Sequence, residues 1–129
     1  MRPYIIMVCL FLLCCSGAAT GQTINEKVVD ALEKNDHEAL VSCFHAMADL
    51  QIPGYNGNFS KSQASVIMKK FLSEQPVASV TISKTGDNSD GSSYAMGELV
   101  SGGKKYRLYF VTKETEGVER VLVLKITGI

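Results

Sequence analysis

The sequence has little cysteine once its first 21 residues are set aside. Three of the four cysteines, Cys9, Cys14 and Cys15, lie in that segment, and only Cys43 follows it. A single cysteine excludes an intramolecular disulfide, so the hydrophobic core alone must hold the remaining domain together. A lone cysteine on the apolar side of a short helix is typically a small core residue; a reactive thiol and an intermolecular bridge are the alternatives.

An excess of charge of one sign is also absent. The chain has 13 Lys and Arg residues against 13 Asp and Glu residues. Without the first 21 residues Arg2 is lost, and 12 basic residues remain against 13 acidic ones. A balance this close to neutral indicates neither nucleic acid nor a strongly charged partner.

Familiar catalytic and metal-binding motifs are missing as well. The sequence contains no G-x-S-x-G nucleophile motif and no phosphate-binding glycine loop. His37 and His45 are eight residues apart with Cys43 between them, which is not a zinc-like spacing. We therefore predict no metal site and no cofactor.

The first 21 residues have the pattern of a secretory signal peptide. Met1 and Arg2 form a short positive region, residues 5–13 are apolar, and residues 19–21 resemble a small-x-small cleavage site. Because a membrane span needs about 20 apolar residues and no second apolar run follows, no transmembrane span is predicted in the mature chain. We expect cleavage after Gly21, leaving residues 22–129 as one exported domain, periplasmic or secreted.

A lipoprotein signal is the rival interpretation of the same segment. A cysteine after a leucine-rich core is the residue that such a signal presents for lipidation, and Cys15 is the better acceptor here. The residue before the modified cysteine is normally small, whereas Cys14 precedes Cys15 and Leu13 precedes Cys14. Simple cleavage is therefore favoured over a lipid anchor.

Residues 59–76 contain the one long amphipathic helix signal. Ser60 can cap its start, Gln63 occupies the capping-box position, and Pro76 prevents continuation. Five apolar residues follow a 3.6-residue period and are expected to be buried on the concave face of a sheet: Ala64, Ile67, Met68, Phe71 and Leu72.

Two shorter helices are predicted before it, over residues 23–34 and 37–44. Thr23 and Glu26 form a capping box for the first, and residues 35–36 separate it from the second. A short strand is predicted next, over residues 47–52. The segment Tyr55-Asn56-Gly57-Asn58 has the composition of a turn that leads into the long helix.

After Pro76 the hydrophobic period changes from 3.6 to 2, which predicts a meander of antiparallel strands. The four strand-like runs are residues 77–84, 93–100, 105–113 and 119–127. In the third run, Tyr106, Leu108 and Phe110 share one face, while Tyr109 and Val111 make the other face partly apolar too. Such strands are covered on both sides, in part by helices and in part by something else, such as a second subunit.

The order of the predicted elements is that of the NTF2-like (cystatin-like) α+β cone: helices first, one long helix in the middle and a curled antiparallel sheet at the end. At residue level the chain resembles the DUF4783 family of small exported proteins from Bacteroidetes. The matching segments are EKNDHEALVSCF, LQIPG, YNGNFSKSQASVIMKKFL, YAMGEL and KKYRLYFVTK. The resemblance implies an exported single domain with an NTF2-like fold, no established biochemical activity and no catalytic residues to transfer. The Q-x-V-x-G inhibitory sequence of cystatins is absent, which disfavours protease inhibition.

NTF2-like cones often enclose an apolar pocket, and enzymes of that superfamily such as ketosteroid isomerase and scytalone dehydratase place Asp, Tyr or His inside it. The candidates here are His45, Asp49, Tyr94 and Tyr106. A desolvated acid or base among them could transfer a proton next to a carbonyl. Alternatively, the tyrosines are packing residues, His45 caps a helix and Asp49 faces solvent.

Two functions from different classes follow. The favoured one is a non-catalytic exported binding or interaction domain, which uses the cone mouth or the outer sheet face to hold a small apolar ligand, a peptide or a second copy of itself. The alternative is a pocket enzyme of the isomerase or dehydratase type. Convergence of the four candidate residues in one enclosed cavity would separate the two.

Overall fold

A computed structural model of the chain describes residues 23–129. The predicted signal peptide, residues 1–21, and the rival lipidation site Cys15 lie outside the described residues. In chain order the elements are α2 (Ile24–Glu33), α3 (His37–Ser42), β1 (Phe44–Ile52), β2 (Tyr55–Ser60), α4 (Lys61–Glu74), β3 (Val77–Asp87), β4 (Ser92–Ser101), β5 (Lys104–Thr115) and β6 (Val118–Gly128).

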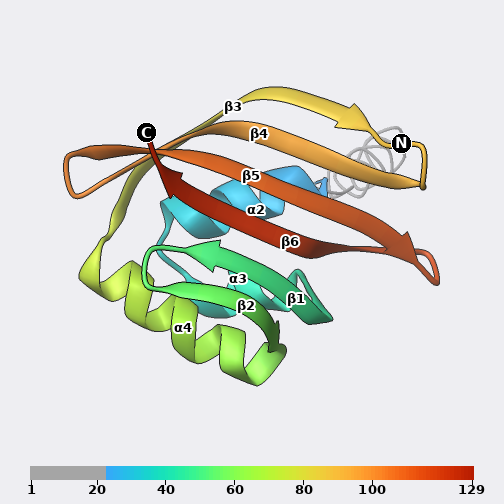
Figure 1. The fold of residues 1–129 in the computed structure, drawn as a ribbon, viewed down its shortest axis with the longest axis horizontal. Coiled ribbons are helices and arrows are strands. Elements are labelled where there is room, and N and C mark those ends of the chain that lie inside the picture. Colours follow the sequence, from blue (N-terminus) through green and yellow to red (C-terminus); the bar gives the residue numbers. More distant parts are fainter. Residues whose placement is uncertain (1–22) are drawn as a thin grey trace, which may run out of the picture.

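The strands form one six-stranded sheet in the order β2-β1-β6-β5-β4-β3 (Figure 1). Strands β3 to β6 are joined as antiparallel hairpins, which confirms the predicted meander. Gly102 and Gly103 close one hairpin and Glu116 and Gly117 close the next, all four with positive φ between 55° and 78°. Positive φ at both positions is what a two-residue turn between right-twisted strands requires.

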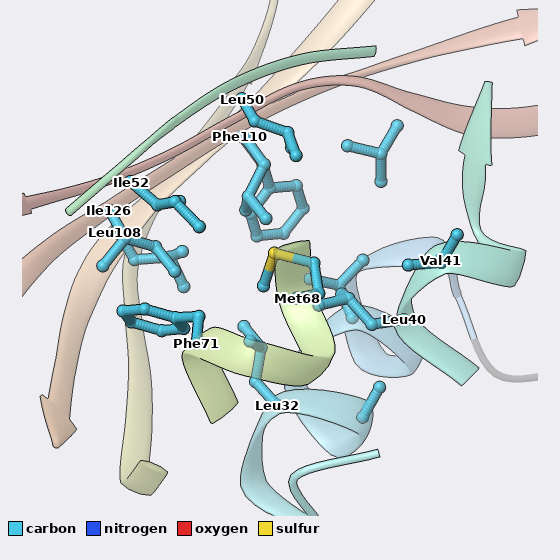
Figure 2. Close-up of a cluster of buried hydrophobic side chains, with 14 of the residues drawn as sticks. Leu32, Leu40, Val41, Leu50, Ile52, Met68, Phe71, Leu108, Phe110 and Ile126 are labelled. Atoms are coloured by element: carbon cyan, nitrogen blue, oxygen red, sulfur yellow. The ribbon is translucent and has the colours of Figure 1, made fainter. Parts of the chain in front are cut away.

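The three helices of residues 23–129 pack on one face of the sheet, which we call the inner face (Figure 2). The α+β class predicted from the sequence is therefore confirmed. Met68 and Phe71 of α4 point toward sheet residues. Leu32 of α2 and Leu40 of α3 lie near Met68, on its side away from the sheet (Figure 2). The side chains that the sheet contributes to this core include Leu50, Ile52, Leu108, Phe110 and Ile126, all at most 5% exposed.

Helix α4 matches the sequence prediction closely. Ser60 is its N-cap, and Ser60 and Gln63 form the reciprocal capping box. The backbone N–H of Gln63 donates to Ser60 Oγ over 3.3 Å. The five residues of the predicted stripe are all buried: Ala64, Ile67, Met68, Phe71 and Leu72. The stripe fills the inner face beside β1 and β2.

The corner where α4 meets β3 is fixed by side-chain hydrogen bonds from distant parts of the chain. The Val77 N–H donates to Asn35 Oδ1 over 2.7 Å, and Asn35 Nδ2 donates to the Val77 carbonyl over 3.2 Å. Asn35 thus pairs with the start of β3 as a neighbouring strand would. It does so with a φ of 55°, a left-handed conformation that asparagine tolerates better than most residues.

The predicted second helix extended too far. It ends at Ser42, and Phe44 begins β1 instead of completing the helix. The Val121 N–H donates to the Cys43 carbonyl over 2.8 Å, and Phe44 is fully buried opposite Val121. Pairing with β6 thus removes the backbone from the helix. This β1–β6 pairing is parallel, whereas every other pairing in the sheet of the described residues is antiparallel.

The predicted turn at residues 55–58 was wrong. These residues form most of the edge strand β2, and Asn56 pairs with Gln51. The reversal occurs earlier, at Pro53-Gly54, where Gly54 has a φ of 92° and Ile52 pairs with Tyr55. Once that turn is made, pairing with β1 overrides the local preference of Asn56-Gly57. The first of the four strand-like runs, predicted over residues 77–84, is longer than expected, because β3 pairs with β4 as far as Asp87.

Replacing Phe71 with Ala should lower the free energy of unfolding by about 3–5 kcal/mol, because the ring is 4% exposed in the core and its loss leaves a cavity. Urea denaturation followed by circular dichroism measures the change. Val66→Ala on the same helix is the matched control: Val66 is 69% exposed, so its change should stay within about 0.5 kcal/mol. Equal small effects in the two variants would show that the α4 stripe does not hold the core together.

Two substitutions at Asn35 separate its hydrogen bonds from its backbone conformation. Asn35→Gly leaves both Val77 backbone groups without their partner but keeps the left-handed φ accessible, so it should cost about 1–3 kcal/mol. Asn35→Ala should cost roughly 1–2 kcal/mol more, because an alanine is strained at this φ. Thermal unfolding of both variants is the measurement. A glycine variant as stable as the native chain would refute the role of the hydrogen bonds.

Candidate functional site

Tyr106 lies on the inner face and has a structural partner. Its side chain is 8% exposed, and its hydroxyl donates to Gln75 Oε1 over 2.7 Å. The Ser101 hydroxyl donates to the Gln75 carbonyl over 2.7 Å. Gln75 is the C-cap of α4, so both hydroxyls hold the end of that helix against β4 and β5.

Asp49 and His45 lie on β1. Asp49 occupies an outward position, is exposed, and accepts a hydrogen bond of 2.7 Å from Asn58 Nδ2 on the edge strand β2. His45 is half-buried and falls in the irregular part of β1, between Phe44 and Asp49, where the register with β6 shifts. Neither residue is directed at the core by the strand pattern.

Tyr94 lies on the outer face of the sheet, opposite the helices. Its ring stacks on that of Tyr109 with centroids 6.3 Å apart and planes at 25°, and Lys125 Nζ lies 5.7 Å from the Tyr109 ring centroid. Tyr94 on β4 is the register partner of Gly86 on β3, and a Cβ atom at Gly86 would come within 2.7 Å of the Tyr94 ring. The missing side chain of Gly86 therefore gives the Tyr94 ring its place on the sheet.

The structure does not bring the four candidate residues together around one cavity. Tyr106 is on the inner face, while Asp49 and Tyr94 are on the outer face. The register connects Tyr94 through Val111 and Val123 to Asp49, three strand spacings away, or about 14 Å. Proton transfer between groups that far apart requires an extended chain of intermediaries.

The outer face instead carries a continuous group of half-buried apolar side chains. Their register places them in two neighbouring rows across β4, β5 and β6. We call this group the outer-face band: Tyr94, Met96, Tyr109, Val111 and Val123. The sequence already indicated part of it through the apolar residues on both faces of the third strand-like run, but only the register shows which residues are contiguous.

A second apolar surface lies at the other end of the sheet, between β2 and α4. It is an open groove of about 520 Å³ lined by Tyr55, Phe59, Ser62, Gln63, Val66 and Ile67. Phe59 covers Gly57, whose missing Cβ would lie 3.4 Å from the ring. This groove, like the outer-face band, is separate from the filled inner face.

Cys43 is a core residue, which agrees with the first of the three interpretations of its lone thiol. Its side chain is 8% exposed, and Sγ lies 3.4 Å from the Ala39 carbonyl as a hydrogen-bond donor. Burial raises the pKa of the thiol above its ordinary value, with weaker opposing effects from Ser42, Lys27 and Lys61.

Residues 23–129 contain no group of three or more His, Cys, Asp or Glu side chains placed to hold a metal ion. No helix in the same range has the length and apolar character needed to cross a membrane.

Comparison with known proteins places the chain in a family of unknown function. The family profile "Domain of unknown function (DUF4783)" matches residues 25–127. A DUF4783 family protein from Bacteroides uniformis has a similar structure, with a TM-score of 0.76, 20% identity, and coverage of 83% of this chain and 98% of that one. No protein with a curated description matches the chain.

Two further solved structures give the fold its broader name. An NTF2-like protein from Cytophaga hutchinsonii is similar with a TM-score of 0.63 and 17% identity, covering 82% of this chain and 93% of that one. An uncharacterised protein with a cystatin-like fold from Caulobacter vibrioides is similar with a TM-score of 0.65 and 18% identity, covering 82% and 84%. The predicted NTF2-like, cystatin-like cone is confirmed.

The thiol of Cys43 should react slowly with iodoacetamide at pH 8 in the folded protein. Only the thiolate reacts, and a raised pKa in the folded state means that less thiolate is present than in the unfolded chain at the same pH. The rate should rise with pH beyond the range in which an exposed cysteine has levelled off, and 6 M urea should remove the difference. Mass spectrometry of the alkylated fraction measures the rate. A native rate equal to the rate in urea would contradict the buried placement.

Proposed function

Because this chain belongs to the DUF4783 family, whose function is not assigned, we propose from its surface that it is a non-catalytic binding domain whose binding site is the outer face of the sheet. The observation that carries this proposal is the outer-face band. Five apolar side chains on three adjacent strands remain half-buried on the side of the sheet that faces away from the core. Contiguous apolar surface of this kind on a soluble domain marks an interaction site more often than chance exposure does.

The packing of the inner face supports a binding domain over a pocket enzyme. The volume in which an NTF2-like enzyme would hold its substrate is occupied here by core side chains, including the fully buried Met68, Phe110 and Leu108. An isomerase or dehydratase also needs an acid and a base around one substrate atom. Asp49 and Tyr94 share only an open face, and Tyr106 is engaged with Gln75 on the opposite one.

The proposal includes the cellular setting that the sequence predicts. If the first 21 residues direct export, the outer face meets its partner in the periplasm or outside the cell. Three kinds of partner fit an apolar surface on a sheet: a small apolar ligand, a peptide, and a second copy of the chain.

Site-specific photo-crosslinking in cells that naturally produce the protein tests the location of the binding site. The full-length chain carries p-benzoylphenylalanine in place of Tyr109 or Met96 on the outer face. Both positions should form a covalent adduct on irradiation, because the probe replaces a side chain within the proposed interface. Mass spectrometry of the adduct then distinguishes a small molecule, another protein and a second copy.

Two control positions make the result decisive. Lys34 on α2 and Val66 in the β2–α4 groove are exposed, and the same probe there should form no adduct of that mass. Adducts from Val66 or Lys34 in the absence of any from Tyr109 and Met96 would overturn the proposal and move the binding site to the groove or to the helices.

A further inference from the structure

The outer face carries more basic than acidic residues although the chain as a whole is neutral. According to the strand register, the outward-facing residues of β3 to β6 lie in the same rows as the outer-face band. Glu98 is the acidic residue in these rows, and Asp49 borders them on β1. The basic residues in the rows are Lys84, Lys105, Arg107, Lys113, Arg120 and Lys125.

These basic side chains surround the apolar band. Lys113 and Arg120 pair beyond one end of it, and Lys105 and Arg107 lie beyond the other. From Lys105 to Lys113 is about 27 Å along β5. Lys125 lies beside Tyr109 in the middle of the band.

The positive charge of the outer face is only partly offset. Glu98 is the register partner of Arg107, and the pKa of Asp90, lowered mainly by hydrogen bonds from Ser92, is lowered further by the charge of Lys113. The ion pair found in residues 23–129 is Lys34–Asp30 on α2, far from this face. The helices carry nearly equal numbers of acidic and basic residues, and the compensating acidic residues lie mainly at the ends of the hairpins: Asp87, Asp90, Glu114, Glu116 and Glu119. The near-zero net charge therefore conceals a sheet face on which basic residues outnumber acidic ones.

We propose that the partner of the outer face is an acidic protein segment, with Asp or Glu side chains flanking apolar ones. This inference rests on the proposed function and adds the chemistry of the partner. The apolar side chains of the partner pack on the outer-face band, and its carboxylates pair with the surrounding Lys and Arg side chains. The excess of basic groups at the rim also attracts such a segment from solution.

Charge decides between this partner and a second copy of the chain. In a symmetric dimer the same patch meets itself, so the basic rim would face an identical basic rim across the interface. Like charges placed opposite each other disfavour that association. The aliphatic members of the band, Met96, Val111 and Val123, favour a protein over an anionic polysaccharide or nucleic acid, which has no aliphatic side chains to cover them.

Binding of a defined probe peptide tests the inference. The probe is a fluorescein-labelled 12-residue peptide in which Glu alternates with Leu and Tyr, and a matched peptide has Lys in place of Glu. Fluorescence anisotropy with the protein from residue 22 onward, the mature chain predicted from the sequence, should show binding of the Glu peptide only. Its Kd should rise about tenfold between 50 and 300 mM NaCl, because salt screens contacts at an exposed rim.

Matched charge reversals locate the contact. Arg107→Glu combined with Lys125→Glu should raise the Kd of the Glu peptide at least about tenfold, and the Gln pair at the same positions should have an intermediate effect. Lys69→Glu combined with Lys70→Glu, on the exposed side of α4, makes the same change in net charge and should leave the Kd within about twofold. Circular dichroism verifies that each variant is folded.

Several outcomes would overturn the inference. These are equal binding of the Lys peptide, an equal loss in the α4 variant, no saturable binding of the Glu peptide, and tighter binding of heparin, of a 12-nucleotide DNA or of phosphatidylserine vesicles at the outer face. Self-association that is lost in the Arg107 and Lys125 variants would assign the face to a second copy instead. If crosslinks form at Tyr109 but charge reversal has no effect, the outer face is the binding site but its partner is not an acidic segment.

Crosslinks confined to the control positions would refute both the proposed binding site and the acidic partner.

Discussion

The packing of α4 against the inner face of the sheet is the constraint on which the rest of the structure depends. Its apolar stripe contacts β1 and β2, and the shorter helices complete the cover of the same face. A helix can bury only one stripe, and a strand presents only alternate residues to it. Filling the inner face therefore fixes the register of every strand relative to the core, and with it which side chains are left on the outer face.

This division has a functional consequence. In an NTF2-like cone with a hollow interior, polar groups can surround a substrate, but here Met68 and Phe71 occupy that space (Figure 2). The outward residues are then the remaining candidates for chemistry or recognition on the sheet. They include the outer-face band and the six basic residues around it, the open surface on which the proposed binding function rests.

The sequence predicted local features well and long-range pairings poorly. The capping box of Ser60 and Gln63, the buried stripe of α4 and the order of the four C-terminal strands follow from spacing within a few residues. The parallel pairing of β1 with β6 joins segments about 75 residues apart, and no local signal specifies it. The wrong prediction of a turn at Asn56-Gly57 has the same origin, since pairing with the neighbouring strand determines the conformation of this segment.

For the candidate site, the sequence identified Tyr94 as a pocket residue, whereas Met96 and Val123 could be grouped with it only through the strand register. Net charge was equally uninformative, because it sums over faces that the fold separates.

The size of the outer face argues for a modest interface. The basic and apolar rows span about 27 Å along the strands and about 14 Å across β3 to β6, or roughly 380 Å². A standard stable interface buries about 800 Å² on each partner. The surface is thus suited to a short segment or a transient partner and is too small for an obligate dimer.

The fixed positions of the aromatic side chains compensate in part for the small area of the outer face. Tyr94 lies over Gly86 and stacks on Tyr109, and Lys125 Nζ lies over the Tyr109 ring. Side chains already held in place lose little conformational entropy on binding, so a small area can still give useful affinity.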